Sequence, residues 1–184
     1  MARQGLWQTF WLTRLSKPAA ERVLYKHVLR ARPARILELG LGMLVRTERL
    51  LRTAGGLAAT PVHYVGLDRF EGRSPSDPPG VSLKDAHRRL HALGKVQLVP
   101  GNADTSLARL CNHLGSFDCV LISADTDERH LERCWFFLQR LIRVDTAVFV
   151  EQRGGQASPW NLVPKATIDD RAARTVQPPL RRAG

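Results

Sequence analysis

The sequence predicts an α/β fold in which helices cover both faces of a mainly parallel sheet of at least five strands. Short apolar runs alternate five times with segments of helical periodicity, the pattern of parallel strands joined by helical crossovers. Each predicted strand also ends in polar residues, which such a sheet gathers at the edge where ligands bind. The length of 184 residues suits one domain with a full core. We therefore expect a single Rossmann-like three-layer sandwich.

Residues 1–33 are predicted to form a helical, basic extension of this domain. Trp7, Phe10 and Trp11 have the i, i+3, i+4 spacing of an apolar stripe on a short helix. A second helix is expected over about 18–31, because the residue before a proline is disfavoured in a helix and Pro33 follows. The aromatic side chains of this stripe must be buried against another apolar surface. Its own domain or a sister subunit would supply one, so a homodimer through this helix is one expectation, and an interfacial membrane helix is the less favoured alternative.

Residues 34–152 contain the predicted strands and crossover helices. The strands are expected at 35–39, 62–67, 96–99, 117–122 and 146–150. The helices between them are expected at about 43–54, 83–93, 107–114 and 127–142. The fourth strand is almost wholly apolar, as a strand covered on both faces should be. Residues 153–184 are rich in Gly, Pro and Arg with little periodic apolar content, so they are predicted to be an irregular basic tail that leaves the sheet truncated at its C-terminal edge.

The first strand runs into a glycine turn that we expect at the centre of a ligand site. Gly40 and Gly42 are separated by one residue and are followed by a helical pattern. Because glycine has no side chain, such a turn lets the backbone approach a ligand closely. The other strand ends add polar side chains to the same edge, namely Glu38, Asp68, Asn102, Asp125 and Glu151.

Four segments resemble, in order and spacing, the motifs of class I S-adenosylmethionine-dependent methyltransferases. These segments are residues 36–42, 65–68, 96–103 and 117–122, and the likeness covers about 34–152. The resemblance implies that S-adenosylmethionine is the cofactor. It also implies that the turn from the first strand holds the methionine end, that the acid after the second strand takes the ribose hydroxyls, and that the residues after the third strand contact adenine. Carried over to this sequence, the candidate cofactor residues are Glu38, Gly40, Gly42, Asp68 with the adjoining Arg69, Asn102 and Ala103.

A dinucleotide-binding domain is the main rival interpretation. Its turn would carry a third glycine, which allows close helix packing and approach of a pyrophosphate. Val45 stands at that position, and its β-branched side chain opposes both. A sulfonium cofactor has no pyrophosphate to accommodate, so Val45 favours the methyltransferase interpretation.

The ends of the fourth and fifth strands show a distant resemblance to the cation-dependent O-methyltransferases, in which acids at these places hold a divalent metal. Here Ser123 replaces an acid, and Glu151-Gln152 replaces Asp-Asn. Hard cations prefer several anionic oxygens, so no metal site is expected. The sequence identifies no firm catalytic residue. Asp125 and Glu151 are weak candidates for the base, and a helix N-cap would explain Asp125 as simply.

The expected function is therefore methyl transfer to a small-molecule acceptor that the sequence does not identify. One alternative is a non-catalytic S-adenosylmethionine-binding or interaction protein on the same fold. Another is a nucleic-acid methyltransferase, because the net charge of +11 is concentrated at the ends: residues 1–35 hold eight basic residues and one acid, and 152–184 hold six and two. Solvated basic tails explain that distribution as well and are favoured. No apolar run reaches the roughly 18 residues of a membrane span, and the N-terminus lacks the continuous apolar region of a secretory signal, so a cytoplasmic protein is expected.

Overall fold

The computed structural model, which describes residues 10–153 and 159–176, contains one six-stranded sheet in the order β3-β2-β1-β4-β5-β6. Strands β1 to β5 pair in parallel, and β6 pairs antiparallel with β5. The strands are β1 (Arg35–Leu39), β2 (His63–Asp68), β3 (Lys95–Pro100), β4 (Phe117–Ile122), β5 (Ile142–Glu151) and β6 (Trp160–Val163). The predicted mainly parallel sheet of at least five strands is confirmed.

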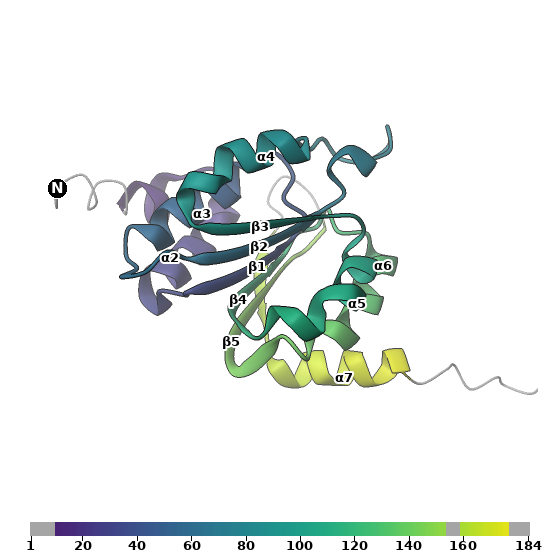
Figure 1. Cartoon of the computed structure of the whole chain (residues 1–184). Helices are drawn as coiled ribbons and strands as arrows, with labels where there is room; N and C mark the ends of the chain where they lie inside the picture. The colour runs from purple at the N-terminus through teal and green to yellow at the C-terminus, as the bar shows by residue number, and fades with distance from the viewer. Residues whose placement is uncertain (1–9, 154–158, 177–184) are drawn as a thin grey trace, which may run out of the picture.

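Helices cover both faces of the sheet, as the three-layer prediction requires. One layer contains α2 (Arg22–Ala31), α3 (Val45–Gly55) and α4 (Leu83–Leu90), and the other contains α5 (Ala103–Leu114), α6 (Glu128–Leu138) and α7 (Lys165–Val176) (Figure 1). Short helical turns complete the chain at Trp11–Leu15, Ala19–Glu21, Phe70–Gly72 and His91–Leu93. None of the helices in the described ranges is both long and apolar enough to cross a membrane.

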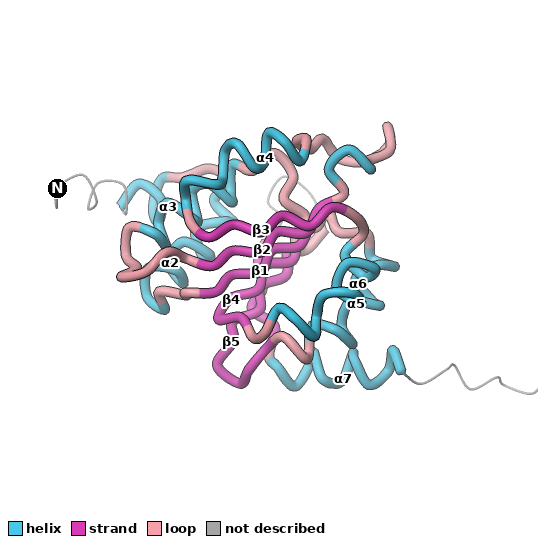
Figure 2. The backbone as a smooth tube through the Cα atoms, viewed as in Figure 1, coloured by secondary structure: helices cyan, strands magenta, loops and turns pink. Residues whose placement is uncertain are grey.

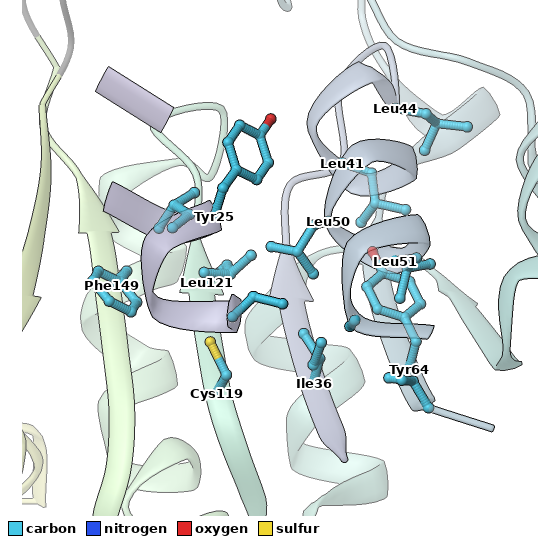
Figure 3. Close-up of a cluster of buried hydrophobic side chains, with 14 of the residues drawn as sticks. Tyr25, Ile36, Leu41, Leu44, Leu50, Leu51, Tyr64, Cys119, Leu121 and Phe149 are labelled. Atoms are coloured by element: carbon cyan, nitrogen blue, oxygen red, sulfur yellow. The ribbon is translucent and has the colours of Figure 1, made fainter. Parts of the chain in front are cut away.

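Two apolar cores lie on the two sides of the sheet. In the first, Tyr25 of α2 and Leu50 of α3 lie near Ile36 of β1 (Figure 3). The next residue of β1, Leu37, belongs to the second core, under α5, α6 and α7. Successive side chains of a strand point to opposite faces, so a strand buried on both sides is apolar at most positions. This requirement explains why the strands were visible in the sequence as continuous apolar runs.

The boundary between α6 and β5 differs from the prediction. A helix was expected to continue to residue 142, but α6 ends at Leu138, and β5 already begins at Ile142. Leu141 is fully buried where the chain turns into β5, and Ile142 pairs with Phe117 ahead of a register shift in the β4–β5 ladder. Because an apolar pair can be buried by a helix end or by a strand start, its composition does not distinguish the two.

The predicted irregular tail is wrong for residues 160–176, which form β6 and α7. Trp160 is buried in the first core, while Ile168 and Ala172 are fully buried in the second, one helical turn apart. These few anchors attach the segment to both sides of the sheet, although their number is too small to give a clear periodic signal. The sheet therefore has a sixth strand at its C-terminal edge. The remaining parts of the predicted tail lie outside the described residues, apart from positions 153 and 159.

The N-terminal segment packs on the domain from residue 12 onward. Leu12 is buried in the first core together with Leu24 and Val28 of α2. Phe10 and Trp11 of the expected aromatic stripe are 51% and 42% exposed, and the Trp11 ring centre lies 5.3 Å from the Arg49 guanidinium. Trp7 lies outside the described residues. The homodimer through this helix stays a prediction.

Candidate functional site

The carboxyl ends of the central strands meet at one edge of the sheet (Figure 2). Residues at and after these strand ends line a small pocket. Of the predicted cofactor residues, Gly40, Asp68, Arg69, Asn102 and Ala103 line this pocket, and so does the candidate base Asp125. The free space in the pocket is about 30 Å³. The sequence thus identified several residues of the pocket wall, whereas Glu38 and Gly42, also predicted to bind the cofactor, do not line it.

The glycine turn after β1 is packed tightly against the chain that leaves β4. Gly40 and Gly42 have positive φ angles of 78° and 55°, which L side chains rarely adopt. A Cβ at Gly40 would approach Ser123 Cβ and Thr126 Oγ1 to 3.1 Å, and one at Gly42 would approach Asp125 Oδ2 to 3.0 Å. Both glycines are therefore required by backbone conformation and by close packing.

Glu38 lies behind this turn, where side chains of the protein surround it. The carboxylate has no exposure, and Arg46 contacts its Oε1 atom with Nε at 2.9 Å and Nη2 at 2.8 Å. Thr47 and Tyr64 donate to Oε2 at 2.9 and 2.7 Å. Burial and the Glu38 carboxylate raise the pKa of Tyr64 well above its usual value, which keeps its hydroxyl a donor. Arg46 also donates to the Gly40 carbonyl at 2.8 Å, so Glu38 supports the turn through Arg46. A direct contact between Glu38 and a cofactor stays a prediction.

Asp68 ends β2 and binds the glycine turn from the other side. Its Oδ2 atom accepts from the backbone N–H groups of Leu41 at 2.7 Å and Gly42 at 3.3 Å. Its Oδ1 atom accepts from the N–H of Phe70 at 3.0 Å. Arg73 donates to both oxygens: its Nη2 atom lies 2.8 Å from Oδ1 and 2.7 Å from Oδ2, and its Nε atom lies 3.2 Å from Oδ1. The carboxylate predicted to bind a ribose thus already has an arginine partner.

Asn102 precedes α5 at the N-cap position, but its side chain does not cap the helix. Its backbone carbonyl accepts from Ser106 N at 3.0 Å. No side-chain hydrogen bond of Asn102 occurs within residues 10–153 and 159–176. An amide that has both a donor and an acceptor and faces the pocket suits the edge of a purine base.

Asp125 and Glu151 occupy different environments. Asp127, not Asp125, caps α6, accepting from Arg129 N at 2.8 Å. The Asp125 carboxylate faces the pocket with no hydrogen bond or ion pair to another described residue, and burial raises its pKa. Glu151 instead accepts from Ser123 Oγ at 2.9 Å and from Ala124 N at 3.0 Å. Nowhere in the described part of the chain do three or more His, Cys, Asp or Glu side chains gather as metal ligands would.

A second, larger pocket adjoins the first at the ends of β4, β5 and β6. It has about 300 Å³ of free space, and Thr126 lines both pockets. Its walls carry charges of both signs, including Glu151, Arg153 and Arg171. The sequence analysis missed this pocket because β6 and α7 contribute to it.

Arg73 and Thr126 are among the residues of the smaller pocket that were not predicted as site residues from the sequence. Arg73 is the only basic residue between Gly72 and Gly80, a segment rich in Ser, Pro and Gly. Thr126 follows Asp125 in the exit of β4. Arg73 lies five residues after the strand-ending Asp68, and no sequence pattern indicated that it would turn back to that carboxylate.

The sequence matches no family model and no curated protein, but the fold matches solved structures. A cofactor-bound protein, Rv0187 from MTB, is 20% identical with a TM-score of 0.55, over 94% of this chain and 75% of that one. The O-methyltransferase from Bacillus cereus in complex with S-adenosylhomocysteine is 18% identical with a TM-score of 0.55, over 81% of this chain and 66% of that one. The calicheamicin methyltransferase CalS11 is 16% identical with a TM-score of 0.56, over 100% of this chain and 90% of that one. The chain spans about two thirds of the Bacillus cereus enzyme. At these identities the likeness concerns the fold, and the chain has the fold of solved methyltransferases, as the sequence resemblance implied.

Proposed function

We propose that this protein is an S-adenosylmethionine-dependent methyltransferase that acts on a small-molecule acceptor. The observation that carries the proposal is the convergence of the Gly40 turn, the Asp68 carboxylate and the free Asn102 amide on one pocket at the carboxyl edge of the sheet. Structural neighbours with this fold include an O-methyltransferase with bound S-adenosylhomocysteine and one with bound S-adenosylmethionine.

The residues of the pocket suit an adenosine cofactor. The Gly40 turn lines the pocket with backbone that carries no side chain, which allows a ligand to approach it closely. Asp68 offers a carboxylate, which can accept hydrogen bonds from both hydroxyls of a ribose, and Asn102 offers a donor and an acceptor to a base. No phosphate-binding glycine stands at Val45, where a dinucleotide site would have one. The chemistry of the donors therefore favours a nucleoside without a pyrophosphate.

The bound cofactor would supply a sulfonium methyl group: the acceptor gains that methyl and loses a proton, while the electron pair of the broken S–CH₃ bond stays on sulfur. Asp125 is the residue placed to take the proton, because its carboxylate faces the pocket and burial raises its pKa above the usual value of an aspartate. Glu151 is engaged by Ser123 and Ala124, so it is the weaker candidate.

The larger pocket is the place we assign to the acceptor. It shares Thr126 with the cofactor pocket, so a molecule bound there would lie beside the transferred group. The names of two neighbours, an O-methyltransferase and a calicheamicin methyltransferase, support a small-molecule acceptor over a nucleic acid.

Calorimetric titration with S-adenosylhomocysteine tests the proposal. The wild-type protein should bind it, and Asp68→Asn should weaken binding about 10- to 100-fold, because hydrogen bonds to a charged acceptor contribute about 1.5–3 kcal/mol. Asp145→Asn is the matched control, since Asp145 is exposed and pairs with Arg143. Folded wild-type protein that shows no binding at millimolar concentration would refute the proposal.

A non-catalytic cofactor-binding protein is the second candidate. One observation in its favour is that Arg46 already pairs with Glu38, and Arg73 with Asp68. Another is the hydrogen bond from Ser123 to Glu151, at positions where the cation-dependent O-methyltransferases carry acids that bind a metal. Transfer of a radiolabelled methyl group to a panel of hydroxyl compounds and RNA separates the two. Binding without transfer to any of them would favour the second candidate.

A further inference from the structure

Arg73 fills the end of the cofactor pocket that the ribose would need. Its side chain is 11% exposed, and the Asp68 side chain that it contacts is 3% exposed. Two of its nitrogens reach the carboxylate, the closest contact being 2.7 Å. The remaining terminal nitrogen, Nη1, donates to the Pro78 carbonyl at 2.8 Å. The guanidinium therefore has partners on both sides.

Several contacts within the loop after β2 fix its conformation around the Arg73 side chain. Arg69 and Asp77 form an ion pair of 2.8 Å across the loop, and Asp77 also accepts from Ser74 N at 2.6 Å. The backbone of Gly80 packs closely against the Arg73 side chain, so that a Cβ at Gly80 would overlap with Nε and Cζ of Arg73. The placement of Arg73 is thus determined by several contacts of the loop, not by a single surface ion pair.

While Arg73 is bound, the Asp68 carboxylate has no free acceptor direction for the hydroxyls of a ribose. Two carboxylate oxygens offer about four lone-pair directions. They already receive three backbone N–H groups and three contacts from Arg73. Withdrawing Arg73 removes half of these contacts and opens space in a pocket whose free volume is about 30 Å³. A ribose and Arg73 therefore exclude each other at Asp68.

We propose that Arg73 is a displaceable plug that competes with the ribose hydroxyls of the cofactor for Asp68, an inference that rests on the proposed cofactor. The apparent dissociation constant of the cofactor equals the intrinsic constant divided by the fraction of molecules in which Arg73 has left Asp68. Arg73 thus sets how much cofactor is needed to occupy the site.

Calorimetry of Arg73 variants with S-adenosylhomocysteine tests the plug. Arg73→Ala should bind at least about tenfold more tightly than wild type, which corresponds to an open fraction of about one tenth or less in the wild-type protein. Arg73→Gln serves as the second variant in case loss of the cation beside Asp68 prevents folding, and it should also bind more tightly. Arg88→Ala is the charge-matched control, because Arg88 is exposed on α4 and pairs with Asp85. Its affinity should stay within twofold of wild type.

Stopped-flow mixing provides a second readout. If Arg73 must leave first, the observed binding rate of the wild type levels off at high ligand concentration, whereas that of Arg73→Gln keeps rising linearly. Equal or weaker binding by both Arg73 variants, with the wild type binding, overturns the plug and leaves the proposed cofactor standing. Absence of binding by wild type and all folded variants overturns both.

Discussion

Replacing Arg46 with methionine should strongly destabilise the protein. Arg46 is 11% exposed at its side chain and contacts the fully buried Glu38 carboxylate at 2.8 and 2.9 Å. Methionine removes the charge and leaves Glu38 with only the hydroxyls of Thr47 and Tyr64. Breaking one half of a buried ion pair costs about 3–5 kcal/mol. Arg46 also lies 4.9 Å from the ring centre of Trp160 and bonds to the Gly40 carbonyl, so the upper part of that range is expected.

Guanidinium chloride unfolding measures this loss, with Arg52→Met as the matched control. Arg52 is on the same helix, is about half exposed and pairs with Glu48 at 3.4 Å, so its replacement should cost only about 0.3–0.5 kcal/mol. Adding Glu38→Gln to Arg46→Met should recover part of the stability, because it removes the uncompensated charge. A loss for Arg46→Met no larger than that of Arg52→Met would refute the role of the pair in supporting the turn.

Two further predictions concern the C-terminal helix and the pH dependence of stability. Ile168→Ala should lower the free energy of unfolding by about 2–5 kcal/mol because Ile168 is fully buried, whereas Val144→Ala, at a position 89% exposed, should change it by less than about 0.5 kcal/mol; similar losses would contradict the packing of α7. Burial lowers the pKa of His27, whose ring centre lies 5.1 Å from that of Phe149. As the pH falls, the imidazole is therefore protonated in the unfolded chain before it is protonated in the folded protein. The stability that the neutral, buried His27 contributes is therefore complete above the unfolded pKa of about 6.5 and is lost as the pH drops below it. The free energy of unfolding of His27→Leu should depend less on pH between about 7 and 5 than that of wild type. An equally steep dependence would contradict the lowered pKa of His27.

The walls of the candidate site could be predicted from the sequence because a parallel sheet imposes them. Parallel strands put all their carboxyl ends at one edge, so polar residues after separate strands had to come together. Gly40, Asp68 and Asn102 follow three different strands and do line one pocket. The same argument needs only the strand positions to within a residue or two, which continuous apolar runs provide.

The contacts of those residues could not be predicted, because they depend on long side chains and loop conformation. An arginine reaches partners in many directions, and nothing in the spacing from Glu38 to Arg46 requires their contact. The choice of Asp127 over Asp125 as the cap of α6 depends on the turn that precedes the helix. Similarly, α7 is held by a few anchors such as Ile168, whose burial only the assembled sheet reveals.

The two acid–arginine pairs of the site are chemically alike, yet their positions give them different roles. Glu38 and Arg46 come from β1 and α3, two elements that the first core holds together, so their separation requires disruption of packed structure. Arg73 is held by the loop after β2, and loops open at lower free energy than packed strands and helices do. Substitution of Arg46 should therefore be measured mainly as lost stability, and substitution of Arg73 mainly as gained affinity. If both substitutions changed stability and affinity to the same extent, the position of each pair in the fold would not be what determines its role.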